Sequence, residues 1–282
     1  MKWIIVTDSS SDMACMKHEL NGEVGFDTVP LKLLIGEDEF VDDEKLDVDV
    51  MMKALAAYPG KSGSAAPSPG EWKEAFEKAD FAVAVTISSN LSGSYASAQA
   101  GIDMLKEEYP DKKVLLVDSR STGPAMMMLA LHAYELAKQD IDFDGMKNAM
   151  DKYFSEIRTL FVLENMDNLV KNGRVSKLAG GMASLLGIKV MGEATPEGTL
   201  GVLKKARGKF QSHDNMIQAM FEKGYKGGLV KLGHCHNDEK AQYVKDKIKA
   251  KFANATVDIY KLRGLDSFYA EEGGIIMSYE IV

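Results

Sequence analysis

The sequence has little cysteine and no long apolar run. Cys15 and Cys235 are the two cysteines among 282 residues, and their wide separation provides no disulfide framework, as expected in a reducing compartment. The chain has no stretch approaching the ~18 apolar residues of a membrane span, and its N-terminal apolar run is too short for a secretory signal. We therefore expect a cytoplasmic protein without a membrane span.

Positive charge is also scarce. The chain carries 34 Lys and Arg against 42 Asp and Glu, for a net charge of -8 and a pI near 5.3. Nucleic-acid-binding surfaces need a basic stripe to meet the phosphates, so DNA and RNA are not expected as partners. With 45% hydrophobic residues, the chain has enough apolar material for a core and a pocket.

Sequence signatures of several enzyme classes are missing. No G-x-G-x-x-G follows an expected strand, and no G-x-S-x-G surrounds a serine, which disfavours dinucleotide binding and α/β-hydrolase chemistry. Gly60-Lys61-Ser62 imitates the end of a phosphate-binding loop, but Leu55 stands where the first glycine is required. We therefore expect no nucleotide or other cofactor.

The first half of the chain repeats a buried strand, a hydroxyl-rich turn and a helix. The three expected strands lie near 3–7, 81–87 and 114–117, and a Ser/Asp turn follows each of them. Strands that are apolar on both faces and alternate with helices indicate a parallel sheet covered on both sides. Ligands of such sheets bind beyond the carboxyl ends of the strands, so the three turns are expected to converge.

The element order changes in the second half. The segment 28–42 is predicted as a hairpin around Gly36, and from about residue 158 a Gly-rich stretch and two strands around 195–198 replace the strand-turn-helix order. The predicted fold is an N-terminal parallel-sheet α/β domain, 1–157, and a C-terminal α+β domain, 158–282. A chain longer than ~250 residues usually divides in this way and leaves a crevice for a ligand.

Serine-rich turns carry the strongest functional signal. The run Ser88 to Ser94 places several hydroxyls between a buried strand and a helix N-terminus, where backbone N–H groups favour an anion. Helix capping explains one such turn equally well. A second small, hydroxyl-bearing turn, 64–72, also enters a helix, and two turns together suit one anionic head group.

Two histidines near the end of an expected strand deserve comparison with a metal site. His234 and His236 are two positions apart and would share a face in an extended chain. No third histidine or Cys-x-x-Cys joins them at ligand spacing, and Asn237-Asp238 beside them is typical of a helix N-cap. No metal site is therefore predicted.

At these turns the sequence resembles the DegV family of bacterial fatty-acid-binding proteins, which serve in many bacteria as the binding subunit of a fatty acid kinase. The fragments that carry the resemblance run in order along the chain: 6–12, 29–31, 67–72, 87–95, 117–119, 171–177 and 206–207. The resemblance implies a long-chain fatty acid buried between two domains, with its carboxylate held by hydroxyls.

The resemblance assigns roles to particular residues. The carboxylate ligands fall on Ser64 and Ser92, with the neighbouring Ser89 included. Arg174 and Arg207 match arginines near the head group or near the surface that meets the kinase. The family's T-S-Q-P turn is Ser64-Ala65-Ala66-Pro67 here, which keeps a hydroxyl but loses an amide.

A second departure lies near the C-terminus. Tyr269 aligns with a histidine that the family often places beside the carboxylate. The expected partners are thus a long-chain fatty acid and a fatty acid kinase catalytic subunit, and the chain itself is not expected to be an enzyme. Two alternatives stay open: a Ser-dependent acyl hydrolase using Ser92 or Ser89, and a carrier of another acidic small molecule.

Overall fold

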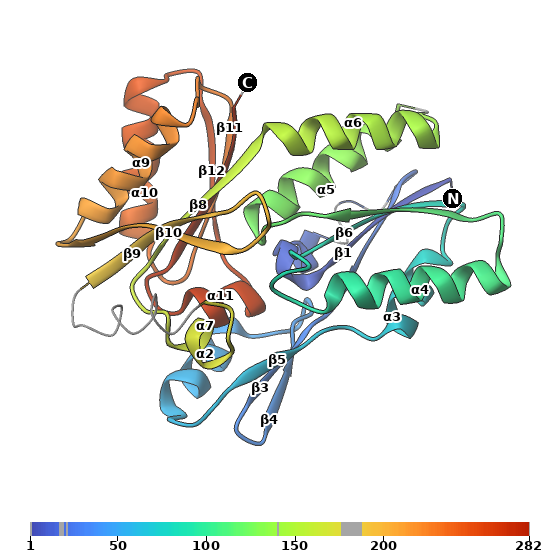
Figure 1. The fold of residues 1–282 in the computed structure, drawn as a ribbon, viewed down its shortest axis with the longest axis horizontal. Helices are drawn as coiled ribbons and strands as arrows, with labels where there is room; N and C mark the ends of the chain where they lie inside the picture. The colour runs from blue at the N-terminus through green and yellow to red at the C-terminus, as the bar shows by residue number, and fades with distance from the viewer. Residues whose placement is uncertain (1, 17–19, 21, 140, 176–187, 282) are drawn as a thin grey trace.

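The chain folds into two sheet-based halves with a small third sheet beneath them (Figure 1). The computed structural model describes residues 2–16, 20, 22–139, 141–175 and 188–281. The predicted fold class, a parallel-sheet N-terminal domain followed by a C-terminal α+β domain, is confirmed. The division at 157/158 stays a prediction, although helix α6 (Phe143–Glu156) ends directly before the first strand of the second sheet.

The N-terminal sheet is parallel throughout. Its strand order is β2 (Gly25–Val29), β1 (Trp3–Asp8), β6 (Phe81–Thr86) and β7 (Lys113–Asp118). Consecutive β1 residues pack on opposite faces, as a strand requires. Ile4 and Val6 join the apolar cluster of α3 (Pro69–Phe76) and α4 (Ser94–Glu108), whereas Trp3 and Ile5 join that of α5 (Pro124–Ala137). The sheet is therefore covered on both faces, as predicted.

A small antiparallel sheet extends from this domain. Its order is β4 (Asp38–Val41), β3 (Lys32–Ile35) and β5 (Gly63–Ala65), and α2 (Val48–Ala57) lies between β4 and β5 in the chain. Gly36 has a φ of 64° in the β3–β4 turn, so the predicted hairpin is confirmed. The pairing of β5 with β3, which positions Ser64, had no signal in the sequence.

The C-terminal sheet is mixed. Its six strands are β10 (Leu200–Arg207), β9 (Ile188–Ala194), β8 (Ile157–Leu163), β13 (Ile275–Glu280), β11 (Leu229–His234) and β12 (Thr256–Lys261), in that order. Only β11 and β12 run parallel. Helices α9 (Gln211–Glu222) and α10 (Asp238–Lys251) bury one face, and the other face turns toward the N-terminal domain.

Two short helices and two turns of 3-10 helix complete the described elements. Helices α7 (Asp167–Lys171) and α11 (Gly264–Ala270) lie at the junction of the two halves, near the small sheet (Figure 1). The 3-10 turns η1 (Ser9–Ser11) and η2 (Ala14–Met16) follow β1. Within the described part of the chain, no helix has the length and apolar character needed to cross a bilayer.

Candidate functional site

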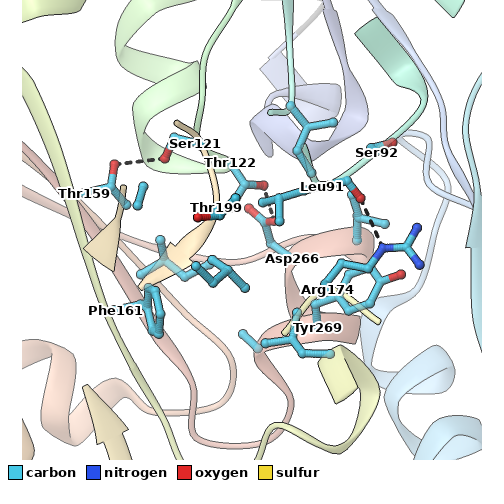
Figure 2. A pocket seen from close by; sticks show the side chains of 18 of the residues that line it. Leu91, Ser92, Ser121, Thr122, Thr159, Phe161, Arg174, Thr199, Asp266 and Tyr269 are labelled. Carbon is cyan, nitrogen blue, oxygen red and sulfur yellow. Dashed lines mark hydrogen bonds between the residues drawn. The ribbon is translucent and has the colours of Figure 1, made fainter. Parts of the chain in front are cut away.

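A pocket lies between the two halves of the protein. Both halves contribute apolar side chains to it, as the close view shows (Figure 2). The apolar lining comprises Leu31, Ile87, Leu91, Phe161, Leu163, Leu169, Ala194, Leu200, Leu265, Ala270 and Ile276. An apolar ligand therefore suits this pocket better than a polar one.

The serine-rich turn after β6 is anchored by a buried carboxylate. Asp8, at the end of β1, accepts hydrogen bonds from the backbone N–H of Ile87 at 2.9 Å and from the Ser94 hydroxyl at 2.6 Å. Both donors flank the turn, so the strand end and the start of α4 are held together. Ser92, between them, lines the pocket. Convergence of the strand ends, predicted from the sequence, is realised at this point.

Ser64 and Tyr269 are in contact at the end of the pocket that Ser92 also lines. Their hydroxyl oxygens are 2.9 Å apart, although Ser64 lies on β5 and Tyr269 on α11. The start of α11 is held against the N-terminal half because Asp42 accepts hydrogen bonds from the backbone N–H groups of Gly264 and Leu265, at 3.0 and 2.9 Å. These bonds fix the position of α11, so that Tyr269 near its C-terminal end lies against β5.

Arg174 adds a cation to this polar end. Its Nε donates to the Leu91 carbonyl at 3.1 Å (Figure 2), and its guanidinium also bonds the Asn172 carbonyl. Both partners are uncharged, so neither neutralises the guanidinium. Ser64, Ser92, Tyr269 and Arg174 thus share one pocket, and their roles toward a ligand stay predictions.

Ser89 and Arg207 do not line this pocket. The Ser89 hydroxyl donates to Asp118 Oδ2 at 2.6 Å, on the exposed outer side of the turn. Arg207 is exposed at the end of β10. A hydroxyl three positions from Ser92 therefore faces another way, because the turn reverses the chain between them.

Sequence reasoning missed a buried acidic contact in the pocket wall. Asp266 lines the pocket and accepts a hydrogen bond from the Thr122 hydroxyl at 2.6 Å. Burial, followed by the nearby Asp12 carboxyl, raises the pKa of Asp266 well above its usual range. Burial thus favours the neutral form of this carboxyl in the pocket wall. No local pattern in the sequence distinguished Asp266 from the other acidic residues.

The turn between β9 and β10 joins the two halves beside the pocket. The Ser88 hydroxyl donates to the Gly198 carbonyl at 2.6 Å, and the Asn90 amide donates to the Glu197 carbonyl at 2.6 Å. Gly198 has a φ of 80°, which favours glycine. A side chain there would also overlap the Ser88 hydroxyl. This contact closes one side of the pocket.

The remaining motifs lie elsewhere. Ser62, in the phosphate-loop imitation, donates to Asn168 Oδ1 at 3.1 Å in a buried contact. His236 lies between Glu272 and Asp49, at 2.8 and 2.9 Å, and the Glu272 carboxylate chiefly raises the pKa of its imidazole. Neither residue lines the pocket, and none of the described histidines does.

Comparisons with known proteins identify the family. A family model described as "Uncharacterised protein, DegV family" matches residues 2–280. A DegV domain-containing protein of Streptococcus gordonii is 40% identical over 281 residues, covering all of both chains.

Two solved structures are also similar over nearly the whole chain. The Fatty Acid Kinase (Fak) B3 protein of Streptococcus pneumoniae, loaded with linoleic acid, is 38% identical with a TM-score of 0.95 and full coverage of both chains. A DegV family protein of Eubacterium eligens, loaded with heptadecanoic acid, is 35% identical with a TM-score of 0.93, covering 99% of this chain and 100% of that one. The protein belongs to the DegV family.

Proposed function

We propose that the protein binds one long-chain fatty acid in the pocket between its two halves. The carboxylate is held by the hydroxyls of Ser64, Ser92 and Tyr269, and Arg174 supplies positive charge. The observation that carries the proposal is the Ser64–Tyr269 hydroxyl pair at one end of an apolar pocket. The two similar proteins that were crystallised with linoleic and heptadecanoic acid support the same ligand class.

The energetics suit such a ligand. Burying roughly fourteen methylenes at about 0.8 kcal/mol each supplies on the order of 10 kcal/mol before the costs of association. A dry, unpaired carboxylate would cost several kcal/mol, which two or three hydroxyl donors offset. The acyl chain therefore provides most of the affinity, and the polar end selects for an acid.

The chain acts without catalysing a reaction in this proposal. A Ser-dependent hydrolase needs a histidine base within reach of the serine, and no described histidine lines the pocket. We propose instead that the bound carboxylate is presented to a fatty acid kinase catalytic subunit in the cytoplasm. Exposed Arg207 is proposed for the surface that meets this subunit.

Mass spectrometry of the purified protein tests the ligand assignment. Protein expressed in a bacterial host is analysed under native conditions, and the ligand is extracted after denaturation. We expect one fatty acid per chain. A different acidic small molecule in the extract would favour the alternative carrier function. No bound acid, together with no uptake of added palmitic acid, would refute the proposal.

A further inference from the structure

Buried hydroxyls form a second polar element of the pocket, away from the proposed carboxylate site. The Ser121 hydroxyl donates to Thr159 Oγ1 at 2.9 Å, and Thr159 Oγ1 lies 2.8 Å from Ser278 Oγ. All three side chains are buried, and Ser121 and Thr159 line the pocket. Figure 2 shows this pair well separated from Ser92, Arg174 and Tyr269, across the apolar side chains.

The backbone holds these hydroxyls in place from both halves of the protein. Ser121 follows β7, where its N–H donates to Ser119 Oγ at 3.1 Å and its carbonyl accepts from the Ser88 N–H at 2.9 Å. Thr159 on β8 and Ser278 on β13 are direct cross-strand partners. The hydroxyl chain, defined as Ser121, Thr159 and Ser278, is thus positioned before any ligand enters.

The hydroxyl chain has unused hydrogen-bonding capacity. Three hydroxyls carry three O–H donors, and the two bonds within the chain use two of them. Lone pairs also remain, because each oxygen accepts up to two hydrogen bonds. Methylene groups packed against Ser121 and Thr159 would leave this capacity unmet, at a cost in free energy. When Ser278 donates to Thr159, the spare O–H is that of Thr159, which lines the pocket, and an oxygen atom on the ligand would accept from it.

The space beyond the hydroxyl chain has charged side chains in its wall. A second cavity shares Arg120, Ser121, Thr159 and Ala194 with the pocket, and its wall includes Arg158. Arg120 donates to the Pro196 carbonyl at 3.1 Å, and Arg158 donates to the carbonyls of Ser155 and Ile157, each at 2.8 Å. A ligand passing the hydroxyl chain therefore reaches the guanidinium groups of Arg120 and Arg158, which can donate hydrogen bonds to an oxygen substituent.

We propose that the pocket is built for a long-chain fatty acid that carries a hydroxyl group on the distal part of its acyl chain. The distal hydroxyl donates to Ser121 Oγ or accepts from the hydroxyl chain, while the carboxylate occupies the end near Ser64. This proposal rests on the proposed fatty-acid binding and names the ligand more narrowly. A hydroxyl chain that merely joins the two halves of the protein would not distinguish hydroxylated from plain acids.

Competition titration with a fluorescent fatty acid tests this ligand class. Delipidated protein is titrated with plain acids and with ω-hydroxy acids, each series running from lauric to stearic length. At the length that places the hydroxyl at Ser121, we expect the hydroxy acid to bind about three- to tenfold more tightly than its plain counterpart, the range of one net neutral hydrogen bond.

Two nearly isosteric variants identify the residues responsible. Ser121→Ala and Thr159→Val are each expected to abolish the preference for the hydroxy acid while binding the plain acid as well as wild type or better. Ser97→Ala is the matched control, because Ser97 is a part-buried hydroxyl that donates to the Pro67 carbonyl and lines neither cavity. The control should retain the full preference.

The outcomes separate the two proposals. Plain acids that bind without any hydroxy-acid preference at any length would overturn the hydroxyl inference and leave fatty-acid binding intact. Equal losses of both acid types in Ser121→Ala and Thr159→Val would also overturn it, since that pattern indicates a structural role. Failure of both acid series to bind wild-type protein would refute both proposals.

Discussion

The hydroxyl oxygens of Ser64 and Tyr269 lie 2.9 Å apart across 205 positions of sequence. Ser64 stands on a short strand of the small sheet, and Tyr269 on a helix of the C-terminal half. The pair thus spans the junction of the two halves at one end of the apolar pocket. Binding of a carboxylate there depends on how the halves pack, so variants at this junction are informative.

We expect Ser92→Ala to weaken fatty-acid binding about tenfold or more, and Ser89→Ala to change it little. Loss of a hydrogen bond to a charged group costs ~1.5–3 kcal/mol. Ser92 lines the pocket, whereas Ser89 bonds the Asp118 carboxylate outside it. Titration with a fluorescent fatty acid measures both Kd values. Equal losses in the two variants would place the carboxylate elsewhere.

Tyr269→His is expected to raise acyl-phosphate formation by a fatty acid kinase catalytic subunit, at matched fatty-acid loading. Histidine becomes cationic near neutral pH and stabilises an ionised carboxylate, whereas a tyrosine hydroxyl only donates a neutral hydrogen bond. Binding should survive because Ser64, Ser92 and Arg174 remain. A wild-type rate equal to that of the variant would argue against this role of position 269.

The stability of the protein should fall as the pH rises from about 4 to about 7. Burial raises the pKa of Asp12 to about 7 and that of Asp42 to about 6, and it raises the pKa of Asp266 well above its usual range. The folded protein therefore binds more protons than the unfolded chain in this window, so the contribution of Asp12 and Asp42 is complete below it and lost above it.

Asp266→Asn tests the origin of this pH dependence. Asparagine keeps an oxygen that accepts from Thr122 and places an N–H donor beside Asp12, so the slope of unfolding free energy against pH should become shallower. Urea denaturation at about pH 5 and about pH 7.5 measures the change in unfolding free energy between the two pH values. Asp111→Asn, which replaces an exposed carboxyl, is the control. An unchanged slope in Asp266→Asn would show that this carboxyl does not govern the effect.

Gly198→Ala should loosen the junction between the halves. The substitution adds a Cβ that overlaps the Ser88 hydroxyl and strains a φ of 80°, and we expect a loss of roughly 1–3 kcal/mol in unfolding free energy. Faster release of bound fatty acid should accompany it. Gly208→Ala, also at positive φ but with no neighbour within 4 Å, isolates the backbone cost. Equal losses of unfolding free energy and equal release rates in the two variants would show that the contact of Gly198 with Ser88 does not stabilise the junction.

Local pattern in the sequence was enough for much of the architecture. Apolar strands such as 81–87 that alternate with helices are typical of a parallel sheet buried on both faces. Gly36 marks the hairpin of β3 and β4 because a positive φ excludes most other residues. The order of the serine-rich fragments along the chain also identified the family before any contact was known.

Only the tertiary structure decided which side chains share the pocket. Ser89 and Ser92 belong to one hydroxyl-rich run, yet one bonds Asp118 and the other lines the pocket. Asp266 and the Ser121–Thr159 pair had no distinguishing local pattern. Their positions depend on contacts such as Asp42 with the start of α11, made between segments more than two hundred residues apart. Periodicity reports which face of an element is buried, but packing between elements determines what that face meets.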